Sequence, residues 1–362
     1  ATGSLISEDP GTAVRTFSFE STSVAADTEF KILTDDADVN DAHILDIHAT
    51  ETTSNLPILS FKVKIEGTQD VELKDLPVNY DVATQNNIDE MVEGLSLVMD
   101  GTEVATVNMT ADCVEDGGTC TTVGADETYI FHDIDTWLKA GQTYHFLVKA
   151  DIYGLTDTGD VAAGDTISAN LTETQTNLAG FDAEDETGTN LVDGDKTGAV
   201  TGSAHEVRDV GIKVALVGTP TATKTAGEVG ATPPSDIGLF TVTFDATAFG
   251  ADMYIDATAP DADGGTTESD LTVTGTGTLL CTLTSPSGAT LSTSYLVSET
   301  ETKRFAVTCD MRDGATDMVD GFFDVALANI AYAITDAQTV NIDYTFDLAD
   351  FKTPQIFLND NE

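Results

Sequence analysis

Two eight-residue stretches decide the fold: residues 58–65 read ILSFKVKI, and residues 237–244 read IGLFTVTF. In both stretches apolar side chains alternate with polar or small ones, as expected for a strand that buries one face in a core. Isoleucine, valine, phenylalanine and threonine predominate, and these residues favour pleated sheets. We therefore expect both stretches to be β-strands, and their similarity suggests an internal repeat.

The same alternation recurs along most of the chain. Between two such runs stands Asp100-Gly101, a pair that favours a two-residue hairpin turn. Only short stretches such as residues 88–92 could form a helical turn. We therefore predict an all-β protein built of β-sandwiches. The other alternating runs lie at residues 71–73, 146–150, 305–309 and 340–346.

Further matches in the same order extend the repeat. Residues 70–73 match 252–255, residues 146–152 match 305–311, and residues 164–171 loosely match 321–327. We infer an internal duplication that gives two tandem immunoglobulin-like β-sandwich domains. The predicted organisation is an extended N-terminal arm over residues 1–24, a first domain over 25–191 with a hairpin insertion near 95–127, a polar, Gly-containing linker over 192–205 and a second domain over 206–362.

The net charge of the chain limits the classes of molecule that it can bind. The 362 residues include 63 acidic and 15 basic ones, for a formal net charge of -48. Phosphate-bearing partners and anionic membrane surfaces would be repelled, so we expect no nucleic acid. The 41% of hydrophobic residues is enough for real cores. No run of about 18 apolar residues occurs, so we expect no membrane insertion.

The N-terminal residue and the four cysteines favour an exported protein. The chain opens at Ala1 rather than at methionine, as after removal of a signal peptide. Of the three pairings that four cysteines allow, Cys113 with Cys120 and Cys281 with Cys309 is the most economical. The alternative is a zinc site, which requires closer spacing and nearby histidines. We therefore expect two disulfides and a secreted protein, either extracellular or on the cell surface.

Catalytic motifs are missing from the sequence. It contains no G-x-S-x-G elbow, no H-E-x-x-H and no phosphate-binding loop. The five histidines are scattered, and with 63 acidic residues some carboxylate pair always lies at a suitable distance. We therefore expect a protein that is not an enzyme.

Acidic loops are the candidates for cofactor binding, because oxygen ligands on loops suit Ca²⁺. Alternatively, each is a solvated acidic loop that binds no metal. Adaptation to high salt would also explain the acidity without any calcium site. The candidate calcium ligands are Asp35, Asp36, Asp38, Asn40, Asp41, Asp193, Asp195, Asp261 and Asp263.

In its strand order and in the sequence of its repeat, the chain resembles secreted immunoglobulin-like-repeat surface proteins of bacteria and archaea. The resemblance covers residues 43–350, through patterns such as LSFKV at 59–63 and AGQTYHF at 140–146. It implies a β-sandwich fold and a role in surface layers, stalks or filaments. It brings no catalytic residues with it.

An exported protein without an active-site motif acts either free in the medium or in an assembly. We expect it to polymerise with copies of itself into a pilus-like filament or a surface lattice, by donating a β-strand to a neighbour. The first candidate strand contains Val14, Phe17 and Phe19, and the second contains Ile356 and Leu358. Alternatively, these segments complete sheets of their own subunit. The alternative function is a monomeric adhesin or glycan-binding module.

Overall fold

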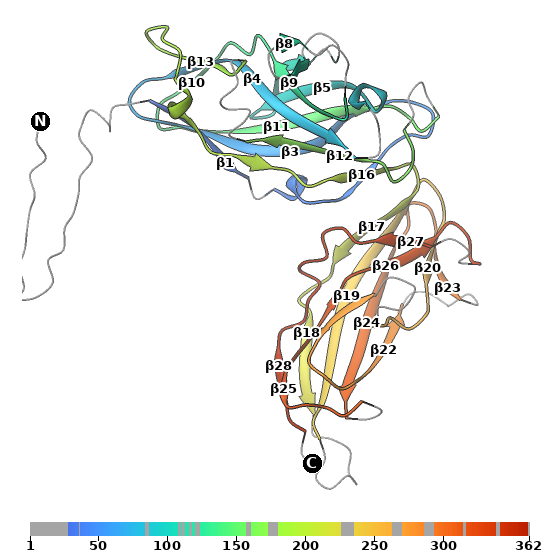
Figure 1. Cartoon of the computed structure of the whole chain (residues 1–362). Coiled ribbons are helices and arrows are strands. Elements are labelled where there is room, and N and C mark those ends of the chain that lie inside the picture. Colours follow the sequence, from blue (N-terminus) through green and yellow to red (C-terminus); the bar gives the residue numbers. More distant parts are fainter. Residues whose placement is uncertain are drawn as a thin grey trace, which may run out of the picture. The chain divides into compact units, whose positions relative to one another are not determined.

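The computed structural model describes residues 28–35, 37–83, 87–107, 109, 113–115, 118–119, 124–156, 161–172, 180–225, 235–262, 270–285, 293–313, 316–337 and 341–360. These residues form strands and short 3-10 turns, and none of their helical turns is long and apolar enough to cross a membrane. The chain divides into unit 1, Ala1–Val207, and unit 2, Arg208–Glu362 (Figure 1). The prediction of an all-β protein is confirmed.

Unit 1 forms two sheets, a 6-stranded one with the order β14-β1-β3-β11-β5-β6 and a 10-stranded one whose path includes β16-β12-β4-β9. Alternate side chains of the long strands β3 and β11 are fully buried between the sheets, as the period of two requires. The elements are β1 (Glu29–Thr34), η1 (Asp38–Asn40), β2 (Ile44–Asp46), β3 (Thr53–Glu66), β4 (Val71–Val82), η2 (Ile88–Glu90), β5 (Val92–Met99), β6 (Thr102–Val107), β7 (Cys113–Glu115), β8 (Gly118–Thr119), β9 (Asp126–Phe131), β10 (Thr136–Leu138), β11 (Thr143–Ile152), β12 (Thr166–Leu171), β13 (Asp182–Asp185), η3 (Asp193–Asp195), β14 (Lys196–Thr197), β15 (Val200–Thr201) and β16 (His205–Arg208).

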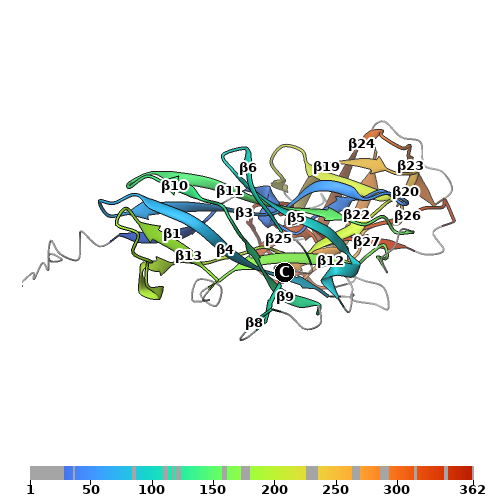
Figure 2. The same ribbon diagram turned by 90° about the horizontal axis from the view of Figure 1, so that it is seen from above.

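Unit 2 forms a 5-stranded sheet with the path β17-β19-β24-β22, a 4-stranded sheet β23-β20-β26-β27 and a small sheet β21-β25-β28. Figure 2 shows β19, β24 and β22 of this unit from above. The elements are β17 (Gly211–Leu216), β18 (Thr221–Thr225), β19 (Ile237–Phe249), β20 (Met253–Asp256), β21 (Leu271–Thr274), β22 (Thr278–Thr284), β23 (Ser294–Val297), β24 (Thr302–Arg312), β25 (Gly321–Leu327), β26 (Ile330–Ala333), β27 (Ile342–Tyr344) and β28 (Ile356–Leu358).

Each unit has the strand order of an immunoglobulin-like sandwich. In such a fold strands A, B, E and D form one sheet, and strands C, F and G form the other. Unit 1 places β1, β3, β11 and β5 in the first sheet, and β4, β12 and β16 in the second. Unit 2 repeats this order with β17, β19, β24 and β22 opposite β20, β26 and β27. The shared topology agrees with the predicted duplication.

A pair of stacked phenylalanines fixes how the two units correspond. In unit 1, Phe61 on β3 lies opposite Phe146 on β11, with ring centroids 5.2 Å apart. In unit 2, Phe244 on β19 lies opposite Phe305 on β24, with centroids 5.5 Å apart. The sequence comparison matched Phe61 with Phe240, so it was wrong by four residues. A shift by an even number keeps every side chain on its face, and alternation alone therefore cannot detect it.

Two predicted segments are integral parts of unit 1. The predicted linker, 192–205, contains β14, which pairs with β1, and β15, which pairs with β12. The start of the predicted insertion, residues 95–107, forms most of β5 and all of β6, and β5 pairs directly with β11. Gly-rich polar sequence does not mark a linker here, because short edge strands need few apolar residues.

Local predictions for two turns are confirmed. The hairpin between β5 and β6 turns at Asp100 and Gly101, which have φ values of 47° and 85°. Both angles are positive, as a type I′ turn requires. The helical turn expected at residues 88–92 is the 3-10 turn η2 at Ile88–Glu90.

Candidate functional site

The outer edge of β22 in unit 2 is the candidate site. β22 is the last strand of its sheet and pairs only with β24 among the described residues. Its sequence, TLLCTLT, contains no charged residue. Natural edge strands are usually protected by charges, proline or a covering segment, because a free edge pairs with other chains. Among the residues that the structure describes, β22 thus offers an extended main chain without the usual protection.

Unit 1 shows how an equivalent edge is covered. Its equivalent strand, β5, is covered by β6 through five register pairs. Leu97 on β5 faces Val148, just as Leu283 on β22 faces Val307. Leu97 is 0% exposed, whereas Leu283 is only half-buried. The difference indicates that one further strand beside β22 would bury side chains that now border solvent.

Two hollows follow the edge of β22 and share Pro260 in their walls. The first is small, with an interior volume of about 30 Å³ that holds one or two water molecules, and it lies beside Leu283 between the two sheets. The second, of about 990 Å³ including open solvent, lies beside Leu279, Val273 and Met311. Leu279 and Leu283 are four residues apart on the same face of β22, so the two hollows follow one another along the strand, and we refer to them together as the groove.

The first hollow is acidic at one side. Asp256 and Asp270 line it together with Asn329. Burial raises the pKa of Asp270 to about 6, and the neighbouring carboxylates of Asp261, Asp256 and Asp343 add to the rise against a hydrogen bond from the main chain of Asp261. This end of the groove therefore holds several negative charges close together and favours a positive group.

Asn329 adds an unsatisfied acceptor to the acidic side. It is 4% exposed, and its Nδ2 donates to Asp343 Oδ1 over 2.8 Å. Its Oδ1 is buried and has no hydrogen-bond partner among the described residues. Leaving a buried acceptor without a donor costs about 1–3 kcal/mol. A donor that enters the hollow would remove this cost.

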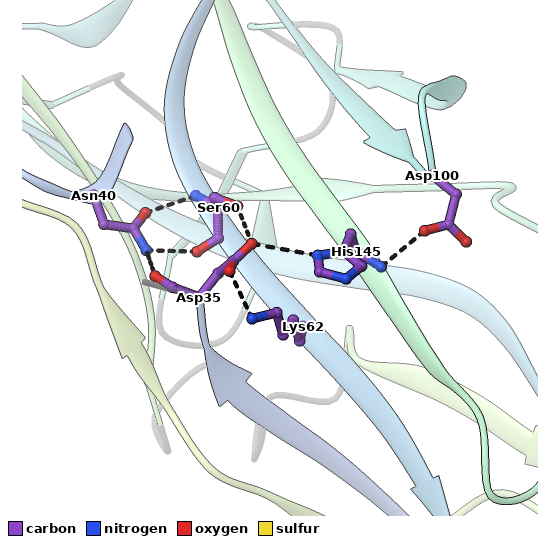
Figure 3. Close-up of polar contacts among 6 residues, drawn as sticks. All are labelled: Asp35, Asn40, Ser60, Lys62, Asp100 and His145. Atoms are coloured by element: carbon purple, nitrogen blue, oxygen red, sulfur yellow. Dashed lines mark hydrogen bonds and ion pairs between the residues drawn. The ribbon is translucent and has the colours of Figure 1, made fainter. Parts of the chain in front are cut away.

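A second polar cluster, on unit 1, surrounds Asp35 (Figure 3). Lys62 Nζ lies 2.8 Å from Asp35 Oδ1, and Ser60 Oγ donates to Asp35 Oδ2 over 2.8 Å. His145 Nδ1 lies 3.4 Å from the same Oδ2. The hydrogen bond from Lys62 is the largest cause that lowers the pKa of Asp35, against an opposing effect of burial.

This geometry does not fit the calcium site predicted for residues 35–41. The carboxylate of Asp35 is already compensated by Lys62, and the Asn40 side chain is bonded to the main chain of Asp35 and Ser60. Asp41 is exposed, whereas Asp36 and the side chain of Asp38 lie outside the described residues. The sequence of this run does not show its cross-strand partners. In the structure, Lys62 on β3 forms an ion pair with Asp35 and compensates its negative charge.

Nor does the cluster form a catalytic triad. In a triad the serine hydroxyl donates to the histidine, which in turn donates to the carboxylate. Here Ser60 and His145 both contact Oδ2 of Asp35, and His145 N donates to Asp100 Oδ1 over 3.0 Å (Figure 3). The arrangement instead joins the end of β1 to β3 and β11.

The other predicted calcium ligands are not gathered into a site. Asp193 is exposed in η3, 3.7 Å from Lys196 Nζ, and Asp195 is half-buried in the same turn. Asp261 is exposed near Asp270, and Asp263 lies outside the described residues. In the part of the chain that the structure describes, no three His, Cys, Asp or Glu side chains are arranged to hold a metal. Calcium binding stays a prediction.

Of the predicted disulfides, Cys281–Cys309 is confirmed and joins β22 to β24. The pairing of Cys113 with Cys120 lies outside the described residues. So do Val14, Phe17 and Phe19 of the predicted donor strand. At the other end, β28 pairs with β25 of its own unit, and Leu358 is 0% exposed. Ile356 and Leu358 therefore complete a sheet of their own unit, as the alternative interpretation held.

Sequence reasoning missed β22 as the site. Its seven residues give a clear strand signal, and the lack of charge in them was the one visible sign of an unprotected edge. Asp256, Asp270 and Asn329 were missed because they come from three separate segments. Only the strand pairing brings them together.

Comparisons with known proteins leave the function open. No protein-family model matches the chain, and no curated protein matches it. Similar solved structures include the C-terminal domain of the AgI/II polypeptide BspA of Streptococcus agalactiae, at 9% identity and a TM-score of 0.24, with 92% of this chain and 99% of that chain covered. A variant of BcpA, the major pilin subunit of Bacillus cereus, has 11% identity and a TM-score of 0.20, with 100% and 75% covered. The B domain of a biofilm-associated protein has 9% identity and a TM-score of 0.21, with 92% and 85% covered. At these scores the likenesses establish neither a function nor a partner.

Proposed function

We propose that this protein is an extracellular structural subunit that assembles head-to-tail, by adding its N-terminal strand to the open edge of β22 in the next copy. The observation that carries the proposal is the difference between the two units. The edge of β5 is covered by β6, whereas the equivalent edge of β22 has no strand beside it among the described residues. An added strand would supply main-chain hydrogen bonds and bury Leu283.

The N-terminal segment supplies the donor. Residues 14–20 read VRTFSFE, an alternating pattern suited to one buried face. The segment precedes β1, and residues 21–27 connect it to Thr28, where the described part of unit 1 begins. At about 3.3 Å per residue, these seven residues span up to about 23 Å when extended.

The symmetry of such a contact leads to a filament. The donor belongs to the start of unit 1, and the acceptor belongs to unit 2. Two different surfaces therefore meet, and a heterologous contact that does not close on itself gives an open chain of subunits. A lattice would require a further contact between chains.

An exterior location agrees with the chemistry of the chain. The Cys281–Cys309 disulfide is of a kind that persists in oxidising compartments. The charge of -48 keeps free subunits apart and soluble. It also makes assembly depend on local contacts that overcome the repulsion between copies.

Two variants of the full chain test the proposal by electron microscopy and sedimentation. Deleting residues 1–20 should abolish filaments. The pair Thr282→Lys and Thr284→Lys adds charges to the edge strand and should raise the critical concentration at least tenfold, equivalent to about 1.4 kcal/mol or more.

The matched control places the same charges two strands further in. Thr241→Lys and Thr243→Lys on β19 lie in the same cross-strand rows as Thr282 and Thr284, yet away from the edge. This control should assemble like the parent chain. Filaments formed normally by the deletion variant would refute the proposal, and equal losses in both lysine pairs would show that β22 is not the acceptor.

A further inference from the structure

The groove beside β22 has two chemically different ends. At the Leu283 end, Asp256, Asp270 and Asn329 form what we call the acidic end. At the Leu279 end, Val273, Leu279 and Met311 form an apolar patch that we call the apolar end, and Asp261 and threonine side chains complete the lining. An occupant that fills both ends must carry a cation and an apolar group on one face, separated by the distance between Leu283 and Leu279.

The N-terminal segment has this pattern. Arg15, Phe17 and Phe19 fall at alternate positions, so an extended chain presents them on one face. Arg15 is the only basic residue among the first 27 residues. The separation of Arg15 and Phe19 is four residues, about 13 Å in a strand, and it equals the separation of Leu283 and Leu279.

We propose that Arg15 of one copy binds the acidic end of the next copy's groove, and that Phe19 fills its apolar end. This inference rests on the proposed strand addition and deepens it by fixing the register. The donated strand runs antiparallel to β22, with Arg15 beside Leu283 and Phe19 beside Leu279. The parallel orientation would place Phe19 against Asp256 and Asp270 and Arg15 away from them, so charge complementarity favours the antiparallel one.

An arginine suits the acidic end better than a lysine or a phenylalanine does. Its methylene stem can lie along the apolar wall made by Phe244 and Val307, while the guanidinium reaches the carboxylates. The guanidinium has five N–H donors in a planar fork, enough for Asp256, Asp270 and the unsatisfied Oδ1 of Asn329. One side chain would thus offset the repulsion among the carboxylates and satisfy the buried acceptor.

Charge reversal tests the acidic end in the full chain. Arg15→Glu should raise the critical concentration at least tenfold, and Asp256→Lys should do the same. The double variant, Arg15→Glu with Asp256→Lys, should have a critical concentration at least tenfold lower than that of either single variant, because the ion pair is restored with its charges exchanged. Recovery is expected only if these two side chains meet, and a double variant as poor as the single ones would overturn the assignment of Arg15.

Photo-cross-linking tests the register without relying on a folded Asp256 variant. A benzophenone amino acid replaces Phe19, and copies with and without heavy nitrogen are mixed so that links between copies can be recognised by mass. The expected links join position 19 to Leu271–Thr274 or Thr278–Thr284 of another copy. Links confined to the same copy, or to other strands, would overturn the register.

The outcomes separate this inference from the proposed function. If filaments require residues 1–20 but the links lie elsewhere, strand addition stands and the register is wrong. If filaments form without residues 1–20, the proposed function itself fails.

Discussion

Removing the Cys281–Cys309 disulfide should destabilise unit 2 by an amount that the structure sets. The bridge joins residues 28 positions apart, across directly opposed positions of β22 and β24. In the chain-entropy description, closing a loop of this length restricts the unfolded chain by about 12 cal/mol/K, or about 3.6 kcal/mol at 25 °C. The variant Cys281→Ala with Cys309→Ala should therefore lose about 3.6 kcal/mol of the free energy of unfolding, in addition to any loss of packing.

Hydrogen exchange followed by mass spectrometry measures this loss in the relevant strands. The most protected amides of β24 should exchange about 400-fold faster in the variant, since each 1.4 kcal/mol is a factor of ten. Fluorescence of Trp137, on β10 of unit 1, serves as an internal reference, because it reports on the unit from which no disulfide is removed.

The matched control is Thr282→Ala with Thr308→Ala, the adjacent cross-strand pair on the opposite face of the same two strands. It removes side chains without opening a covalent loop, and it should change exchange by less than about fivefold. If the cysteine variant exchanges no faster than this control, the bridge does not stabilise the unit and the reasoning from loop length is refuted.

Three further predictions concern pH, packing and salt. Burial lowers the pKa of His205 to about 4, with a smaller contribution from His43, so the unfolded chain binds the proton more readily and the protein should lose about 2 kcal/mol between pH 7 and pH 5. Urea titrations should show this loss in the parent chain and in the exposed control His48→Gln, but not in His205→Gln; an undiminished loss in His205→Gln would assign the pH dependence to other groups. Phe244→Ala removes one of the stacked core rings and should lower the free energy of unfolding by about 3–5 kcal/mol in the same titrations. The control Phe244→Leu should lower it by less than about 1.5 kcal/mol if the site repacks. Equal losses in the two variants would contradict a cavity effect. Raising sodium chloride from 0.1 to 1 M shortens the screening length from about 10 to 3 Å, so light scattering should show a lower critical concentration, whereas weaker assembly would mean that exposed ion pairs outweigh the repulsion from the -48 charge.

The fold class could be predicted because alternation is a local property. Residues 58–65 and 237–244 each carry enough of the pattern to define a strand without knowledge of a partner. The correspondence between the units could not be fixed in this way. Matching Phe61 with Phe240 and matching it with Phe244 give the same inward face, and only the stacking of Phe244 on Phe305 distinguishes them.

The candidate site was less predictable, because it depends on contacts between distant segments. The run at residues 35–41 suggested calcium from its acids alone, yet Lys62 and Ser60 on a neighbouring strand engage Asp35. Asn329 carries no signal in the sequence, and its importance follows from burial without a partner for Oδ1. An open edge is likewise a property of the sheet and not of β22 alone.

The central claim is that copies of this chain are joined by a strand added beside β22. Electron cryomicroscopy of filaments assembled from the full chain tests it most directly. The account predicts an extended segment from a neighbouring copy, antiparallel to Thr278–Thr284, with the side chain of residue 15 at Asp256 and Asp270. A filament in which β22 keeps a free outer edge, or in which residues 14–20 pair within their own copy, would contradict it.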